Sequence, residues 1–176
     1  MHPNDPRPVA PERSITIAFD GACKGNPGPG GYAAILVDDH TQAETIVRGG
    51  EPQTTNNRME LRAAIEALNA LPPGAVVTMI GDSEYVLKGM TAWMPAWKEK
   101  GWRTTKGKPV LNVELWQALE AAAAQHAVVR WTWVRGHQGH ALNERVDQMA
   151  SEQARWVGLV GASQQPRSTR GVHHHG

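Results

Sequence analysis

The sequence has little of several features that mark particular protein classes. Cys23 is its single cysteine, so no intramolecular disulfide can form. Its apolar runs are far shorter than the 18 or so residues that a membrane-spanning helix needs. Residues 1–13 contain four prolines and lack the apolar stretch of a signal peptide. We therefore expect a cytoplasmic protein with no membrane segment and no disulfide framework.

An excess of charge of one sign is also missing. Lys and Arg number 18 against 17 Asp and Glu, which gives a net charge of +1 with His neutral. Taken as a sum, this balance argues against a nucleic-acid partner, because proteins that bind nucleic acids present basic surfaces. The charge is unevenly distributed, however: residues 88–108 hold six basic residues and one acid, Glu99, and carry +5.

Length and composition are those of a single globular domain. The chain has 176 residues, 40% hydrophobic and 20% charged, which is typical of neither a disordered nor a fibrous protein. The two ends are different in character: residues 1–13 are Pro-rich, and residues 158–176 are rich in Gly, Ser, Gln and Arg. We expect one domain over residues 14–157 between two disordered tails.

Hydrophobic periodicity predicts an α/β fold. Alternating or continuous apolar residues predict strands over 14–20, 32–37, 45–50, 75–80 and 128–134. Helical spacing, capping residues and prolines predict helices over 58–71, 83–88, 112–126 and 143–157, with Asn112 as the cap of the third. Residues 20–31, with five glycines and two prolines, are expected to form a loop. A strand meander followed by helix-linked strands predicts layers around a mixed sheet.

Acidic residues follow two of the predicted strands. Asp20 and Asp82 each come after a buried strand, and adjacent parallel strands would bring both carboxylates to one edge of the sheet. Two such carboxylates repel unless a cation lies between them, and Mg²⁺ prefers oxygen ligands. The sequence has no Cys/His cluster with zinc spacing. Taken singly, an aspartate at the end of a strand is more often an ordinary turn residue or helix cap; two of them, each after a buried strand, make the two interpretations about even.

Three more residues extend this pattern, and each also has an ordinary explanation. Glu60 lies in the first turn of a predicted helix, where the helix dipole favours a carboxylate in any case. Asp147 lies within the last predicted helix, where it could belong to a solvated face. His137 lies in a Gly-flanked loop and could shuttle protons or be a plain surface histidine. From the residues alone, the pattern indicates metal-dependent hydrolysis of an anionic substrate.

Five motifs, in order along residues 14–157, resemble the type 1 ribonuclease H family. They are Asp20-Gly-Ala-Cys-Lys-Gly-Asn-Pro-Gly-Pro-Gly-Gly-Tyr32, Thr54-Thr-Asn-Asn-Arg-Met-Glu-Leu61, Gly81-Asp82-Ser83, Trp131-Thr-Trp-Val-Arg-Gly-His137 and Asn143-Glu-Arg-Val-Asp147. The resemblance implies a ribonuclease H-like fold, in which a three-strand antiparallel meander plus two parallel strands form a five-stranded mixed sheet flanked by helices. It also implies endonucleolytic hydrolysis of the RNA strand of RNA–DNA hybrids, leaving 5′-phosphate and 3′-hydroxyl ends.

The same resemblance implies the roles of the site residues. Asp20, Glu60, Asp82 and Asp147 match the family's metal-binding carboxylates. They would hold two Mg²⁺ ions in the presence of substrate, and Mn²⁺ could replace them. His137 matches a loop histidine that assists proton transfer or product release. We accordingly expect a monomer that binds an RNA–DNA hybrid and needs no cofactor besides the metal.

Substrate contacts are implied in the same way. Asn26, Asn56 and Asn57 resemble minor-groove contacts that detect the 2′-hydroxyls of RNA, although turn and cap roles would also explain them. Thr55 and Asn112 match a pocket for a DNA phosphate. Residues 89–109 match a basic protrusion that grips the DNA strand, in which we expect Trp93 to contact DNA. We expect the other two tryptophans of that segment, Trp97 and Trp102, to be core residues.

The chain departs from the family's pattern at three positions. Gln53 stands where some relatives have arginine, Glu84 stands where glutamine is frequent, and Glu99 interrupts the basic cluster. The alternatives are a catalytically weak module that binds hybrids without cutting them, or a nuclease of the same fold that cuts DNA.

Overall fold

The structure, a computed structural model, describes residues 13–134 and 140–163. Its five-stranded sheet has the order β3-β2-β1-β4-β5. β1, β2 and β3 pair antiparallel, whereas β1, β4 and β5 pair parallel. The predicted mixed sheet is therefore confirmed. The strands are β1 (Ser14–Cys23), β2 (Gly28–Asp38), β3 (Glu44–Thr54), β4 (Val76–Gly81) and β5 (Val128–Trp133).

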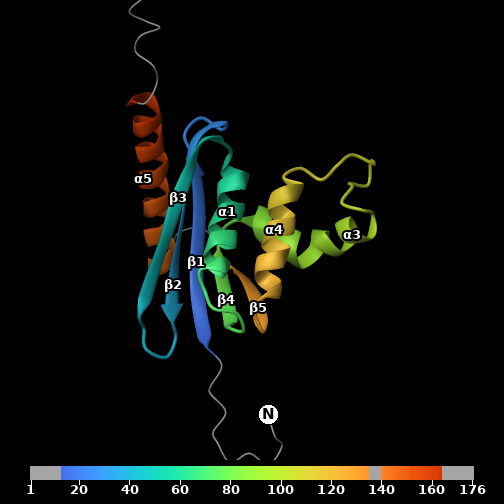
Figure 1. Cartoon of the computed structure of the whole chain (residues 1–176), viewed down its shortest axis with the longest axis horizontal. Coiled ribbons are helices and arrows are strands. Elements are labelled where there is room, and N and C mark those ends of the chain that lie inside the picture. Colours follow the sequence, from blue (N-terminus) through green and yellow to red (C-terminus); the bar gives the residue numbers. More distant parts are fainter. Residues whose placement is uncertain (1–12, 135–139, 164–176) are drawn as a thin grey trace, which may run out of the picture.

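Helices cover both faces of this sheet. α5 lies along β1, β2 and β3 on one face, α1 lies on the opposite face, and α4 packs beside α1 (Figure 1). Within the described residues, no helix combines the length and apolarity needed to cross a bilayer. The described helices are α1 (Asn56–Asn69), α2 (Glu84–Lys88), the π-helix η1 (Gly89–Trp93), α3 (Met94–Glu99), α4 (Val113–Ala124) and α5 (Ala141–Ser163).

Strand alternation builds two cores. Along β1, Ile15, Ile17 and Phe19 join the large core on the α1 side, while Ala18 joins a smaller core that includes Val146 of α5. Successive residues of a strand point to opposite faces, so one strand can line both cores. The central position of β1 fixes the relative placement of both major helices.

The predicted loop over residues 20–31 is mostly strand, so that prediction was wrong. β1 continues to Cys23 and β2 begins at Gly28, which leaves a short turn between them. Glycine permits backbone to approach closely where a side chain would not fit. A Cβ at Gly31 would lie 2.4 Å from the backbone nitrogen of Ala154 in α5. The glycines therefore allow close packing of helices on the strands.

Several helix boundaries differ from the sequence prediction, most clearly the start of α1 and the end of α5. Thr55 is the N-cap of α1, and its hydroxyl accepts a hydrogen bond from the backbone N–H of Arg58, so the helix begins at Asn56. α5 continues to Ser163, six residues beyond the predicted end at Val157. Residues 158–163 contain no proline, and a glycine within a helix costs only about 1 kcal/mol relative to alanine.

α2, η1 and α3 form a nearly continuous helical segment that ends in a projecting loop (Figure 1). Gly89, at the start of η1, packs against the buried indole of Trp116, since a Cβ at this position would lie 2.0 Å from a ring carbon. A π-turn is a local widening of a helix, and such turns are frequent near functional sites. The close packing of Gly89 on Trp116 anchors the projecting segment to α4.

Candidate active site

Asp20 and Asp82 lie next to each other because of the register between β1 and β4. The last parallel pair of these strands is Ala18 with Ile80, and each aspartate stands two residues beyond it. The carboxylates therefore emerge together at the carboxyl end of the parallel strands, as the sequence predicted. That edge is where ligands bind in open α/β sheets.

Glycine brings a third carboxylate to the same edge. A Cβ at Gly21 would lie 2.4 Å from the backbone nitrogen of Glu60 and 2.5 Å from the carbonyl carbon of Met59. Only glycine leaves room for α1 to lie this close to β1. Gly21 is therefore what allows Glu60, in the second turn of α1, to lie beside the strand that carries Asp20.

Asp147 reaches the site from the other face of the sheet. It lies on α5, which packs on β1 and β2, and its side chain shares a hydrogen bond with Asp20. A hydrogen bond between two carboxyl groups requires a proton on one of them. The structure thus gathers Asp20 from β1, Glu60 from α1, Asp147 from α5, and Asp82 from the connection between β4 and α2.

The electrostatics of Asp20 reflect this crowding. Asp20 is only 5% exposed. Burial raises the pKa of its carboxyl from 3.8 to about 9, and the charge of Asp82 and the hydrogen bond with Asp147 add to the rise. The backbone N–H of Gly21 donates a hydrogen bond to Asp20 Oδ1 at 2.8 Å, and this bond lowers the pKa in part. Without a cation, Asp20 is therefore protonated at neutral pH.

The pKa of the Glu60 carboxyl is also raised, but by less than that of Asp20. Burial raises the pKa of its carboxyl from 4.5 to about 7, and the charge of Asp82 acts in the same direction. The hydroxyl of Ser83 donates a hydrogen bond to Glu60 Oε2 at 2.6 Å and lowers the pKa in part. Ser83 is the N-cap of α2, and its contact with the second turn of α1 has no local signal in the sequence.

The chemistry of these donors fits a hard divalent cation. All four side chains offer carboxylate oxygens, the ligands that Mg²⁺ prefers, and a cation would favour the charged forms that burial and, to a smaller extent, repulsion disfavour in Asp20 and Glu60. Within residues 13–134 and 140–163, no three His, Cys, Asp or Glu side chains stand in an arrangement that could hold an ion as they are placed. A bound cation would favour the charged forms of these carboxyls and so oppose the raised pKa of Asp20.

His137, the predicted proton carrier, lies outside the described residues. The described chain stops at Val134, directly after β5, and resumes at His140 before α5. β5 is paired with β4, the strand that leads to Asp82, and the indole N–H of Trp133 donates to the backbone carbonyl of Asp82 at 3.4 Å.

The asparagines predicted to contact RNA gather at the start of α1. Asn26 Oδ1 accepts a hydrogen bond from the backbone N–H of Asn56 at 2.9 Å, which ties the β1–β2 turn to the helix. All three side chains, those of Asn26, Asn56 and Asn57, are exposed. Asn26 thus has the turn role that the sequence left open, since it joins the β1–β2 turn to α1. The N-cap of α1 is Thr55 and not Asn56.

Asn112 occupies the N-cap position of α4 but does not act as its cap, so that part of the prediction was wrong. Its backbone is left-handed, with φ 60°, and in the described part of the chain its side chain makes no capping hydrogen bond. Instead Nδ2 donates to the Tyr85 hydroxyl at 3.2 Å, and Oδ1 accepts from Arg58 at 3.4 Å. Arg58 also pairs with Glu114 at 2.6 Å. Thr55 and Asn112 are therefore linked through Arg58.

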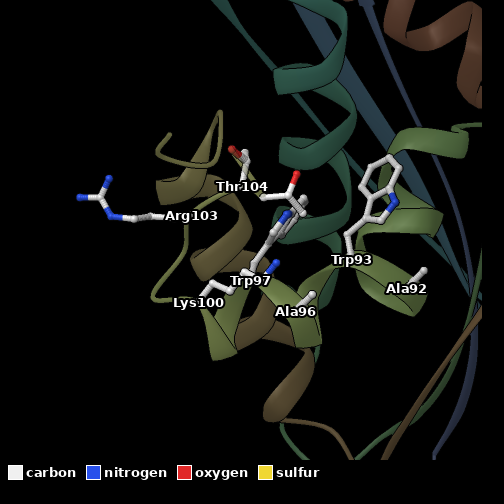
Figure 2. Close-up of a pocket in the computed structure, with 8 residues that line it drawn as sticks. Ala92, Trp93, Ala96, Trp97, Lys100, Arg103 and Thr104 are labelled. Atoms are coloured by element: carbon white, nitrogen blue, oxygen red, sulfur yellow. The ribbon is translucent and has the colours of Figure 1, made fainter. Parts of the chain in front are cut away.

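An aromatic pocket lies in the projecting segment. Trp93 and Trp97, with ring centroids 5.8 Å apart, line a pocket of about 420 Å³ whose remaining walls include Lys100, Arg103 and Thr104 (Figure 2). Trp97 also packs edge-on against Trp116, which is fully buried. Trp93, in contrast, is 38% exposed.

The burial of the other tryptophans agrees with the sequence prediction. Trp97 and Trp102 are partly buried against the main core, with ring centroids 6.4 Å apart. The basic residues differ in a way the sequence did not indicate: Lys98 Nζ lies 2.6 Å from Glu120 Oε2 of α4. Lys98 therefore braces α3 against α4, whereas Lys100 and Arg103 line the pocket.

Comparisons with known proteins agree with this geometry. Residues 12–155 match the family model described as RNase H. Ribonuclease H of Hahella chejuensis is 55% identical over 139 residues, which cover 79% of this chain and 92% of that protein. The crystal structure of LC9-RNase H1, a type 1 RNase H with the type 2 active-site motif, is similar with a TM-score of 0.73 and 35% identity, covering 84% of this chain and 74% of that one. LC11-RNase H1, solved in complex with an RNA/DNA hybrid, shares the fold with a TM-score of 0.62 and 22% identity, over 80% of this chain and 96% of that one.

Proposed function

The chain belongs to the ribonuclease H family, and from that premise we propose that it is an endonuclease that hydrolyses the RNA strand of RNA–DNA hybrids. The products are 5′-phosphate and 3′-hydroxyl ends. The observation that carries the proposal is the gathering of four carboxylates at the carboxyl end of β1 and β4. A similar fold has been solved with an RNA/DNA hybrid bound, in LC11-RNase H1.

The ribonuclease H family uses divalent metal ions. For this chain we propose two Mg²⁺ ions, replaceable by Mn²⁺, with Asp20, Glu60, Asp82 and Asp147 as the ligands. Held by these residues, the ions would supply the positive charge that favours ionisation of an attacking water and offsets the charge on the leaving 3′-oxygen. The described residues support this assignment by their chemistry, since the buried carboxylates repel each other in the absence of cations.

The protein's own groups prepare the site for this reaction. Asp20 is held within the paired strand β1, Asp82 directly follows the last residue of β4, and Glu60 is held by α1 and by Ser83. Rigid elements position reacting groups more exactly than loops do. His137, on the connection between β5 and α5, would carry protons to or from the site or assist release of the product.

Recognition of the hybrid is divided between two surfaces. Asn26, Asn56 and Asn57, at the start of α1, would detect 2′-hydroxyls of the RNA strand across the minor groove. Thr55 accepts a hydrogen bond from its own helix and so retains its hydroxyl proton for a phosphate oxygen of the DNA strand, beside Asn112.

The projecting segment supplies the second surface. Trp93 is exposed at the mouth of the aromatic pocket, where it can pack against a sugar or base while Lys100 and Arg103 meet phosphates (Figure 2). A single chain supplies all of these groups, which is consistent with a monomer as the working enzyme.

Cleavage of labelled duplexes tests the proposal. A hybrid labelled on its RNA strand should be cut internally in Mg²⁺ and left intact in EDTA, while matched DNA–DNA and RNA–RNA duplexes should remain uncut. Asp20→Asn should lose cleavage and still bind the hybrid. Binding by the wild-type protein without any cutting across Mg²⁺ and Mn²⁺ titrations would instead identify a module that only binds, and cutting of the DNA duplex would identify a DNA nuclease.

A further inference from the structure

Ser83 stands between three elements of the site. It follows Asp82 at the end of β4, precedes α2 and contacts Glu60 on α1. Its side chain is only 7% exposed, and it makes two hydrogen bonds at once. Its hydroxyl oxygen accepts from the backbone N–H of Val86 at 3.2 Å, and its hydroxyl proton goes to Glu60 Oε2 at 2.6 Å.

The first of these bonds orients the second. A serine hydroxyl has one proton and two lone pairs. With a lone pair engaged by the N–H of Val86, the hydroxyl is held by the first turn of α2, and the proton is left for Glu60. An O–H donor bonded to a carboxylate at 2.5–2.7 Å is in the range of strong, charge-assisted hydrogen bonds.

Both ends of the contact are rigid. Val86, which supplies the N–H, is fully buried in the main core, and so is Met59, the neighbour of Glu60. The carboxylate of Glu60 therefore cannot change its orientation without breaking a short hydrogen bond to a group fixed by packed backbone. The contact engages Oε2 and leaves Oε1 for other ligands.

We propose that Ser83 is a positioning residue, which orients the Glu60 carboxylate so that Oε1 is presented to the cation and substrate. This inference rests on the proposed function, because Glu60 acts there as a ligand. The hydroxyl bond lowers the number of orientations that the half-buried carboxylate must lose when a cation binds.

The test separates this role from simple helix capping. Ser83→Ala removes the hydroxyl and the cap, Ser83→Gly removes the hydroxyl but preserves most of the cap's contribution to stability, and Ser83→Thr preserves both. Mn²⁺ binding to each substrate-free protein is measured by isothermal titration calorimetry, and kcat and KM are measured on the labelled hybrid. Urea unfolding confirms that each variant is folded.

If Ser83 positions Glu60, Ser83→Ala and Ser83→Gly should both weaken Mn²⁺ binding and lower kcat by roughly 10-fold, with KM for the hybrid within about twofold of wild type. Ser83→Thr should restore both quantities. In a Glu60→Gln background, Ser83→Ala should have no further effect on Mn²⁺ binding, since the residue acts through the carboxylate.

Three results would overturn the inference: unchanged Mn²⁺ binding and kcat in the two hydroxyl-free variants, an effect in Ser83→Ala that Ser83→Gly does not share, or an equal effect in the Glu60→Gln background. The proposed function fails on a different observation, namely that the wild-type protein does not cut the hybrid. The two failures are therefore distinguishable in one set of assays.

Discussion

Replacing Asp20 with asparagine should stabilise the metal-free protein at neutral pH while abolishing cleavage. Burial raises the pKa of the Asp20 carboxyl from 3.8 to about 9. A raised pKa means that the folded protein holds the proton while the unfolded chain releases it, so stability is lost as the pH rises from about 4 towards 9. Asparagine is neutral throughout, and its amide N–H can still donate to Asp147.

The magnitude follows from the pKa difference. A pH of 7 lies about three units above the pKa of this carboxyl in the unfolded chain, 3.8, and below its pKa in the folded protein, about 9. The carboxyl is therefore ionised in the unfolded chain and protonated in the folded one. At 1.36 kcal/mol per unit, the ionisable side chain costs the folded state about 4 kcal/mol relative to a neutral one. The free energy of unfolding of Asp20→Asn should exceed that of wild type by almost nothing at pH 4 and by about 4 kcal/mol at pH 7, and the excess should be greatest above pH 9.

Urea unfolding in EDTA at several pH values measures this difference. Glu152→Gln, which removes an exposed carboxylate from α5 outside the cluster, is the matched control and should not reproduce it. Adding Mg²⁺ should stabilise the wild type by mass action and narrow the gap to Asp20→Asn. An Asp20→Asn protein whose stability parallels that of wild type at every pH would refute the argument that burial and crowding hold this carboxyl in its protonated form.

Three further perturbations probe the packing and the projecting segment. Gly21→Ala should lower the free energy of unfolding, measured by urea titration, by about 1–3 kcal/mol and should lower turnover, because the added methyl group would push α1 away from β1. The control is Gly161→Ala, which adds a methyl group in open space on α5 and should be neutral or stabilising in the same titration. Lys100→Ala should weaken hybrid binding and reduce the slope of log K against log salt by about one, whereas Lys98→Ala should leave that slope nearly unchanged, because Lys98 is already paired with a carboxylate of α4. His126→Ala should lower the free energy of unfolding by about 2 kcal/mol, because the ring nitrogens of His126 bond the backbone of Leu68 in α1 and of Ala75, just before β4. At temperatures where the variant stays folded, its kcat should equal that of wild type, because within the described residues His126 contacts none of the four carboxylates.

Strands and helices with strong periodicity were predictable because their signals are local. The alternation of Ile15, Ile17 and Phe19 predicted a half-buried strand, and the structure places all three in one core. The hairpin over residues 20–31 was missed for the opposite reason: its glycines read locally as a loop, but they serve the close approach of α1 and α5. Local rules have no information about which element will pack on a strand.

The same division holds for the site. Asp20 and Asp82 could be placed together from two strand ends and the assumption of parallel pairing, and the register bears that assumption out. The capping role expected of Asn112 was wrong because contacts to Tyr85 and Arg58, distant in sequence, take its side chain. The brace between Lys98 and Glu120 was likewise out of reach of a charge count.

By itself, the sequence determined the family of this protein and the order of its strands and helices, and it predicted which acidic residues form the candidate site, because motifs and periodicity are properties of neighbouring residues. Only the tertiary structure decided which groups touch: the carboxyl of Asp20 with that of Asp147, the hydroxyl of Ser83 with Glu60, and Lys98 with Glu120, while Lys100 lines the aromatic pocket. These contacts join residues from separate elements, and their energies depend on burial and distance, which exist only once the sheet and its helices have assembled.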